Sequence, residues 1–255
     1  RSRLIWNTLA AGLLAACSAL PTRPKVAATT AQRIELLDIG QGDASLIETR
    51  DSVGIFDTGS VHALTQAAWL KLLAARGITR LNWLALSHLD EDHAGGALTL
   101  LASLPIDCFS MPEPQLNSSK ASKWLAQAQN YGVPVADCIP FPHGHTVAQF
   151  NRKGKPKPNT GMGILYVPLE DGSEYVVTGD AEKGDEVQAA RFALKERQKR
   201  AALPVGERIL KVSHHGSKTG SQEETLRLLM PTQAWISVGV GNHFGHPNTQ
   251  ALARL

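Results

Sequence analysis

The sequence predicts an α/β sandwich, because three separate apolar runs lead into metal-ligating side chains. The runs 81–86, 176–178 and 209–212 are each followed by histidines or an aspartate. In α/β proteins, residues far apart in sequence meet at the sheet edge where strands end. We therefore expect the three runs to be strands whose ends build one site.

The first half of the chain is expected to form an antiparallel sheet and then helices. Its short apolar runs are separated by Gly, Asp and Ser, which favour turns. Apolar residues then recur at helical spacing ahead of Gly77, a residue type that ends helices. The elements predicted here are strands 34–37, 44–48 and 54–56, helix 64–75, strand 82–86, and helices 94–103 and 118–131.

The second half repeats the order of strands followed by helices. A hairpin is expected around the turn residues 170–173, and a helix must stop before Pro231. The elements predicted here are strand 133–138, turn 140–146, strands 163–167 and 175–178, helix 185–200, strand 209–212, a helix ending at 226–229, and strand 234–238.

Residues 1–20 differ from the rest of the chain. An apolar run from Leu4 to Leu20 follows the basic start, Arg1 and Arg3. Its length is close to the lower limit for crossing a bilayer, about 17 residues. We expect the end of a transmembrane helix, with a signal-like segment as the alternative because residues 14–17 fit a lipoprotein cleavage box. A buried or peripheral helix is a third alternative.

The remaining boundaries follow from composition. Residues 21–32 contain two prolines and little periodicity, which is typical of a linker. We predict one hydrolase domain over residues 33–255. Since 251–255 carries no stop signal, we expect this domain to continue beyond the C-terminus.

Composition permits a nucleic-acid partner without requiring one. The 255 residues are 43% hydrophobic and 19% charged, with a formal net charge of +3, as in ordinary soluble domains. Basic residues gather in 152–158 and late in the helix 185–200. The three cysteines lack metal-binding spacing, and a bridge between Cys108 and Cys138 is expected only in an oxidising compartment.

Residues 88–93 indicate a metal site. His88, Asp90, Asp92 and His93 directly follow a predicted strand. Imidazole nitrogen and carboxylate oxygen are ligands of divalent Zn, Mn and Fe, and two carboxylates this close repel each other unless a cation offsets them. The alternative for this segment alone is a solvated acidic turn, but a later aspartate, Asp180, and later histidines favour the metal site.

These residues resemble the metallo-β-lactamase superfamily, whose signature is His-x-His-x-Asp-His followed by a later Asp and a later His. The departure is Asp90, which stands where most members have histidine. This variant resembles the C-terminal hydrolase-like domain of the ComEC/Rec2 competence proteins, over residues 34–255. The other motifs that carry the resemblance are 37–44, 56–59, 178–180, 211–219 and 242–247.

The resemblance implies an αββα sandwich that binds two divalent metal ions. Asp180 is expected to bridge the ions, and His214 to complete the second site, with His215 as the alternative. A carboxylate at position 90 favours manganese over zinc, because oxygen ligands suit manganese. The implied metal ligands are His88, Asp90, Asp92, His93, Asp180 and His214.

The resemblance also suggests roles around the metal ions. Asp92 is expected to orient the nucleophile, and His246 to contact phosphate or donate a proton, with a structural turn histidine as the alternative for His246. Asp43 and Asp57 are expected to support the ligands from behind, since a metal-bound imidazole needs an acceptor for its other nitrogen. Turn formation is the alternative for both. The expected catalytic residues are Asp92, His215 and His246, and the expected substrate-binding residues are Ser217, Lys218, Thr219 and Asn242.

The function implied is a metal-dependent phosphodiesterase, a deoxyribonuclease of the exonuclease type, that degrades one DNA strand during uptake. Its expected partners are DNA as a single strand or duplex end, a membrane channel region of the same polypeptide, and other DNA-uptake proteins. We expect attachment to the inner or cell membrane as part of a polytopic protein, with its side of the membrane left open. The alternatives are a small-molecule hydrolase acting on a lactone, thioester or β-lactam, and an inactive DNA-guiding module.

Overall fold

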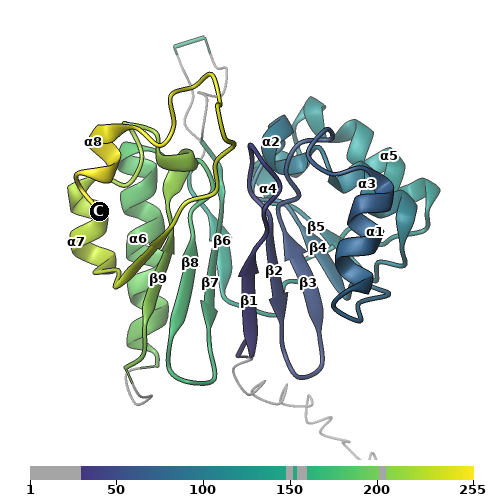
Figure 1. Ribbon diagram of the computed structural model, residues 1–255, viewed down its shortest axis with the longest axis horizontal. Helices are drawn as coiled ribbons and strands as arrows, with labels where there is room; N and C mark the ends of the chain where they lie inside the picture. The colour runs from purple at the N-terminus through teal and green to yellow at the C-terminus, as the bar shows by residue number, and fades with distance from the viewer. Residues whose placement is uncertain (1–29, 148–151, 154–159, 201–204) are drawn as a thin grey trace, which may run out of the picture.

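Two five-stranded sheets lie face to face between two layers of helices (Figure 1). The computed structural model describes residues 30–147, 152–153, 160–200 and 205–255. Helices α1 (Gln66–Ala74), α3 (Ala97–Ser103) and α5 (Ser122–Asn130) cover the outer face of one sheet, and α6 (Lys183–Gln198) and α7 (Glu223–Leu229) cover the other. This arrangement confirms the predicted αββα sandwich.

The first sheet has the strand order β1-β2-β3-β4-β5. Its first three strands are antiparallel, and β4 and β5 are added in parallel. The strands are β1 Arg33–Leu36, β2 Ser45–Glu48, β3 Val53–Phe56, β4 Trp83–Ala85 and β5 Phe109–Ser110. The helices of this half are α1 Gln66–Ala74, α2 Glu91–Ala94, α3 Ala97–Ser103, α4 Glu113–Leu116, the short 3-10 helix η1 Ser119–Ala121, and α5 Ser122–Asn130.

The second sheet has the strand order β10-β9-β8-β7-β6. Strands β8, β9 and β10 are parallel, whereas β6 and β7 are antiparallel to their neighbours. The strands are β6 His143–His145, β7 Gly163–Pro168, β8 Glu174–Val177, β9 Arg208–Lys211 and β10 Gln233–Trp235. The helices of this half are α6 Lys183–Gln198, the 3-10 segment η2 Ser213–Gly216, α7 Glu223–Leu229 and α8 Thr249–Leu252.

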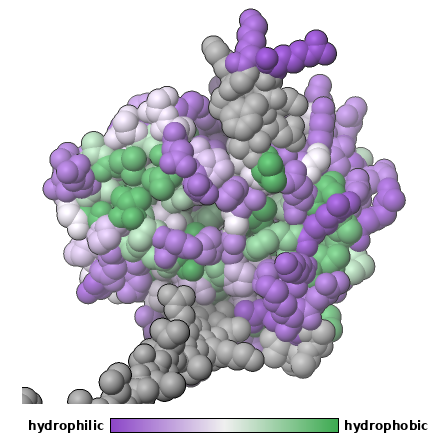
Figure 2. All heavy atoms as spheres, turned by 180° about the vertical axis from the view of Figure 1, so that it is seen from behind, coloured by the Kyte–Doolittle hydropathy of each residue, from purple (hydrophilic) through white to green (hydrophobic). Residues whose placement is uncertain are grey.

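Apolar side chains from both sheets fill the space between them. Phe56 and Trp83 from the first sheet share one buried cluster with Leu165, Val167 and Tyr175 from the second. A Cβ on the strand residue at position 54 would overlap the Trp83 indole, which explains the glycine there. Seen from behind, the molecule has hydrophobic patches separated by hydrophilic side chains (Figure 2).

Two predicted elements near the sheet edges are wrong. Segment 133–138 makes a single bridge from Val135 to Phe109 instead of a strand, because Pro134 lacks an amide hydrogen and the Cys108–Cys138 disulfide ties the segment down. The predicted turn 140–146 contains β6, which pairs with β7. Its sequence, His-Gly-His, has no apolar alternation that would have indicated a strand.

Other differences concern the ends of the chain and of its elements. Strand β10 stops at Trp235, three residues before the predicted end, and α8 was not predicted. None of the helices in the described part of the chain is long and apolar enough to cross a membrane. The segment 1–20 lies outside the described residues, and so does most of the basic stretch 152–158.

Candidate metal centre

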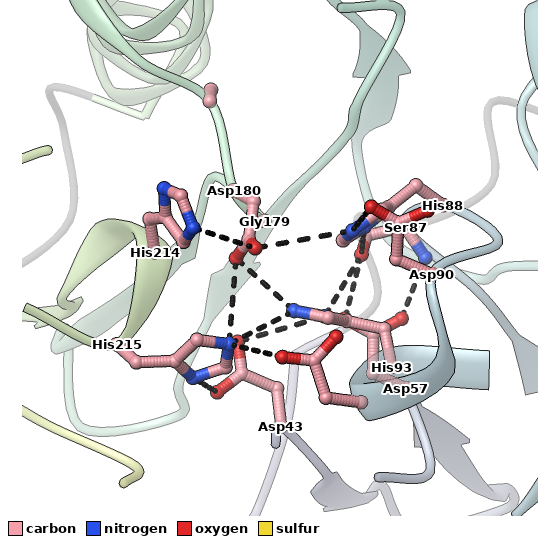
Figure 3. Close-up of polar contacts among 12 residues, drawn as sticks. Asp43, Asp57, Ser87, His88, Asp90, His93, Gly179, Asp180, His214 and His215 are labelled. Carbon is pink, nitrogen blue, oxygen red and sulfur yellow. Dashed lines mark hydrogen bonds and ion pairs between the residues drawn. The ribbon is translucent and has the colours of Figure 1, made fainter. Parts of the chain in front are cut away.

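The predicted site residues meet at one edge of the sandwich, where several parallel strands end (Figures 1 and 3). Asp57 follows β3, and His88 follows β4. From the second sheet, Asp180 follows β8, and His214 and His215 follow β9. Each half of the domain therefore supplies part of the site.

Four histidines of the site are oriented by contacts at their Nδ1 atoms. Because each Nδ1 faces an oxygen, it carries the proton, and each Nε2 is left with a lone pair. The Nδ1 contacts are His88 to Ser87 Oγ at 3.0 Å, His93 to Asp57 Oδ2 at 2.9 Å, His214 to Glu182 Oε1 at 2.7 Å, and His215 to the Ser237 carbonyl at 3.0 Å.

All four Nε2 atoms point toward the carboxylate of Asp180, whose side chain is buried (Figure 3). Asp180 Oδ1 lies 3.1 Å from His93 Nε2 and 3.7 Å from His215 Nε2. Asp180 Oδ2 lies 3.6 Å from His214 Nε2 and 4.0 Å from His88 Nε2. Each carboxylate oxygen thus faces one pair of imidazoles.

Two further carboxylates lie at the open side of the site. Asp92 Oδ2 is 3.1 Å from His215 Nε2, and Asp90 Oδ2 is 3.8 Å from His88 Nε2. The side chain of Asp90 is 49% exposed and that of Asp92 29% exposed, whereas the histidine rings behind them are nearly buried. This side is where solvent and a substrate can reach the site.

The buried imidazole nitrogen atoms fit a bound cation. The Nε2 of His88 is buried without a hydrogen-bond partner. The Nε2 atoms of His93 and His215 lie 3.3 Å apart. Two lone pairs this close repel unless a cation or a proton lies between them, and imidazole with carboxylate is a donor set for divalent transition metals. These residues fit a metal.

The electrostatics also favour positive charge at this point. Burial alone would lower the pKa of His93, but the carboxylates of Asp180, Asp57 and Asp43 outweigh burial and hold it well above its ordinary value. Burial would raise the pKa of Asp180, but His93 and its neighbours hold it well below its ordinary value. Burial, reinforced by His93, lowers the pKa of His88.

Asp43 lies close to the ligands but faces their outer side. One ligand atom each from Asp43, His93, Asp180 and His215 fit within 4.8 Å of one another. However, Asp43 Oδ2 pairs with the buried ammonium of Lys211, and Asp43 Oδ1 lies 3.3 Å from His215 Nδ1, not Nε2. A neighbouring ammonium repels a metal ion, so this position suits support of His215.

Asp57 occupies a similar supporting position behind His93. Besides its contact with the His93 ring, its carboxylate accepts hydrogen bonds from the backbone and side chain of Ser87, both at 2.7 Å. The backbone of Asp57 has a φ of 62°, which is unusual for a non-glycine residue. Asp57 therefore links the end of β3 to the loop that carries His88 and His93.

The residues 217–219 are placed beside the centre rather than in it. Ser217 Oγ and Thr219 Oγ1 are 2.8 Å apart, and the Thr219 hydroxyl donates to Glu182, the residue that orients His214. Lys218 is exposed at the same edge. The Ser217 and Thr219 hydroxyls thus form hydrogen bonds within the protein, and Lys218 faces solvent.

His246 lies at the rim, and Asn242 holds the loop that carries it. The His246 ring centroid is 5.7 Å from that of His214. The Asn242 side chain amide donates to the Gly239 carbonyl at 3.0 Å and to the His246 carbonyl at 2.6 Å. The side-chain amide of Asn242, which was expected to bind substrate, therefore holds this loop in shape.

Sequence reasoning missed four residues that orient the ligands. Ser87 and Ser237 gave no signal, because serine is common in turns. Glu182 could have been suggested by its place two residues after Asp180. Lys211 was the clearest signal, since a charged residue inside an apolar strand needs a buried partner.

Comparisons with known proteins agree with this fold. Residues 37–240 match the metallo-beta-lactamase superfamily. ComE operon protein 3 of Bacillus subtilis (strain 168) is 27% identical over 245 residues, which cover 87% of this chain and 30% of that protein. Recombination protein 2 of Haemophilus influenzae is 29% identical over 228 residues, which cover 88% of this chain and 26% of that protein.

A third relative, competence protein ComA of Neisseria gonorrhoeae, is 27% identical over 236 residues, which cover 91% of this chain and 31% of that protein. The chain spans less than a third of the length of each of these three relatives. With a match that extends over most of its length, the chain belongs to the metallo-beta-lactamase superfamily, and its predicted resemblance to the ComEC/Rec2 competence proteins is confirmed.

Proposed function

We propose that the chain is a dinuclear metal-dependent deoxyribonuclease that degrades one DNA strand during DNA uptake. The observation that carries this proposal is the division of ligands around Asp180. One carboxylate oxygen faces His88 and His214, next to Asp90, and the other faces His93 and His215, next to Asp92. Two equivalent ligand sets sharing one carboxylate suit a pair of ions.

In this proposal His215 belongs with Asp92 and His93, and His214 belongs with His88. Two divalent cations held by these residues would supply an activated water and charge stabilisation for a phosphodiester displacement. Asp92, on the open side, is placed to orient a nucleophile, and His246 at the rim is placed to contact the leaving group. Three carboxylates in the ligand sets favour manganese over zinc.

DNA as the substrate is supported by the relatives. One is named a recombination protein and another a competence protein, and all three match this chain over most of its length. Because the chain spans less than a third of each, the membrane channel region, membrane attachment and contacts with other DNA-uptake proteins are part of the proposal.

The test is DNA hydrolysis by the purified chain with Mn²⁺, with Mg²⁺ alone, and with EDTA. We expect activity with Mn²⁺ only, because an imidazole-rich set is a poor site for magnesium. Asp92→Ala and His93→Ala should each lower the rate by more than about 100-fold, since losing an outer partner of a ligand already costs 10–100-fold.

His143→Ala is the matched control, because His143 pairs with Asp137 and the Phe141 carbonyl, away from the centre. It should keep the wild-type rate. DNA hydrolysis that persists in EDTA, or is lost only in His143→Ala, contradicts the proposal. Rapid hydrolysis of a lactone or β-lactam with no action on DNA would favour a small-molecule hydrolase.

A further inference from the structure

The loop between β10 and α8, residues 239–247, has a defined shape although it lies at the surface (the yellow loop in Figure 1). Asn242 accepts a hydrogen bond from the His246 amide at 3.0 Å, in addition to the two that its side chain donates. The Gly239 amide donates to Gln41 Oε1 at 3.1 Å, which ties the loop to the first half of the domain. The loop is therefore held by hydrogen bonds within itself and by a hydrogen bond to the first half of the domain.

This loop presents an aromatic ring to solvent. Phe244 is 55% exposed. Its ring centroid lies 4.0 Å from that of His243 and 6.0 Å from that of His246, and the planes of Phe244 and His246 differ by 17°. A single exposed aromatic ring is unremarkable by itself, but a loop this constrained keeps the ring at one defined place.

The place of Phe244 is next to the candidate metal centre. The His246 ring contacts both Phe244 and His214, with centroids 6.0 Å and 5.7 Å away, and His214 Nε2 is 3.6 Å from Asp180 Oδ2. The exposed ring is thus two side chains from the bridging carboxylate. The exposed Lys218 supplies positive charge at the same edge of the domain.

We propose that Phe244 is the platform on which an unpaired base of the cleaved strand stacks. This inference rests on the proposed function and makes it more specific. Stacking uses the face of a base and not its hydrogen-bonding edge, so the contact tolerates every sequence but requires the base to be free of a duplex. The substrate is then a single strand or a frayed end, held by its base at Phe244 and by its phosphate at the metal centre.

The experiment measures binding of the metal-loaded chain to an oligodeoxythymidylate with a cleavage-resistant phosphorothioate backbone, and to an abasic oligomer with the same backbone. Phe244→Ala should weaken binding to the base-containing oligomer by about 5- to 150-fold, the loss expected for one base–aromatic stack. Phe244→Trp should restore binding. Val240→Ala is the matched control, since Val240 is a fully exposed apolar residue of the same loop.

Two further readouts separate stacking from a general disturbance of the site. Wild type and Phe244→Ala should bind the abasic oligomer equally, because neither can stack on it. The dependence of affinity on salt should not change in Phe244→Ala, whereas Lys218→Ala should make it shallower.

Equal binding of the base-containing oligomer by wild type and Phe244→Ala, in a chain that degrades DNA, overturns this inference and leaves the proposed function standing. Failure of Phe244→Trp to restore binding also overturns it. If the wild-type chain neither binds nor degrades DNA, both proposals fall.

Discussion

At the level of single residues, the buried pair Lys211–Asp43 supports the candidate metal centre from behind His215. Both side chains are buried; Lys211 is the last residue of β9, and Asp43 lies in the loop that precedes β2 of the other sheet. Burial would raise the pKa of Asp43, but the ammonium of Lys211 and the neighbouring histidines hold it below its ordinary range. Asp43 thus stays ionised behind His215, where it helps to fix the imidazole.

We predict that Lys211→Met destabilises the fold by about 3–5 kcal/mol, because it leaves the Asp43 carboxylate buried without its partner. Urea unfolding of the two proteins measures the difference. The double variant Lys211→Met with Asp43→Asn should recover most of the loss, since it removes the orphaned charge. A single variant as stable as the wild type would show that the pair has no structural role.

The residue scale also shows why the role of each late histidine could not be predicted. The resemblance implied that His214 completes the second metal site, with His215 as the alternative. His214 and His215 both have left-handed backbones, with φ of 49° and 53°. This turn directs both Nε2 atoms toward Asp180, and no motif spacing reveals it.

At the scale of elements, Glu186 joins α6 to the start of α7. Its carboxylate accepts hydrogen bonds from the Ser221 amide at 2.6 Å, the Gln222 amide at 3.0 Å and the Thr225 hydroxyl at 3.2 Å. Burial raises the pKa of Glu186 to about 7, although these hydrogen bonds oppose the shift. The contact holds the segment 217–222 against α6, beside the metal centre.

This raised pKa predicts a pH dependence of stability. The folded protein binds the Glu186 proton more tightly than the unfolded chain, whose value is near 4.5, so stability falls as pH rises from about 4.5 through about 7. Glu186→Gln should remove this part of the dependence. Between about pH 5 and pH 8, the wild type should lose about 2 kcal/mol more than the variant. Parallel stability curves for the two proteins would show that Glu186 does not titrate in this range.

Elements were predicted well where the local sequence pattern alone determines them. The strands β2, β3, β7 and β8 fall within a residue or two of their predicted limits, because each is a short apolar run between turn residues. The segments at the edges of the two sheets were predicted poorly. Strand β6 exists because β7 offers a free edge to it, and segment 133–138 fails because a disulfide and a proline decide its path. Both depend on distant partners.

At the scale of the whole molecule, the candidate metal centre joins the two halves of the sandwich. The first half supplies His88, Asp90, Asp92 and His93, and the second supplies Asp180, His214 and His215. Sequence motifs predicted six of these residues as ligands, with His215 as the alternative to His214, because parallel strands end at a common edge in such folds. How the ligands divide around the two oxygens of Asp180 depends on tertiary geometry and could not be read from spacing.

Native mass spectrometry of the chain loaded with Mn²⁺ counts the ions that the residues around Asp180 hold. We predict two ions per wild-type chain, fewer than two in Asp180→Asn, and two in the control Asp38→Asn, which changes an exposed aspartate outside the centre. A wild-type chain that binds at most one ion, or an Asp180→Asn variant that keeps both, would show that the chain does not hold two ions through Asp180.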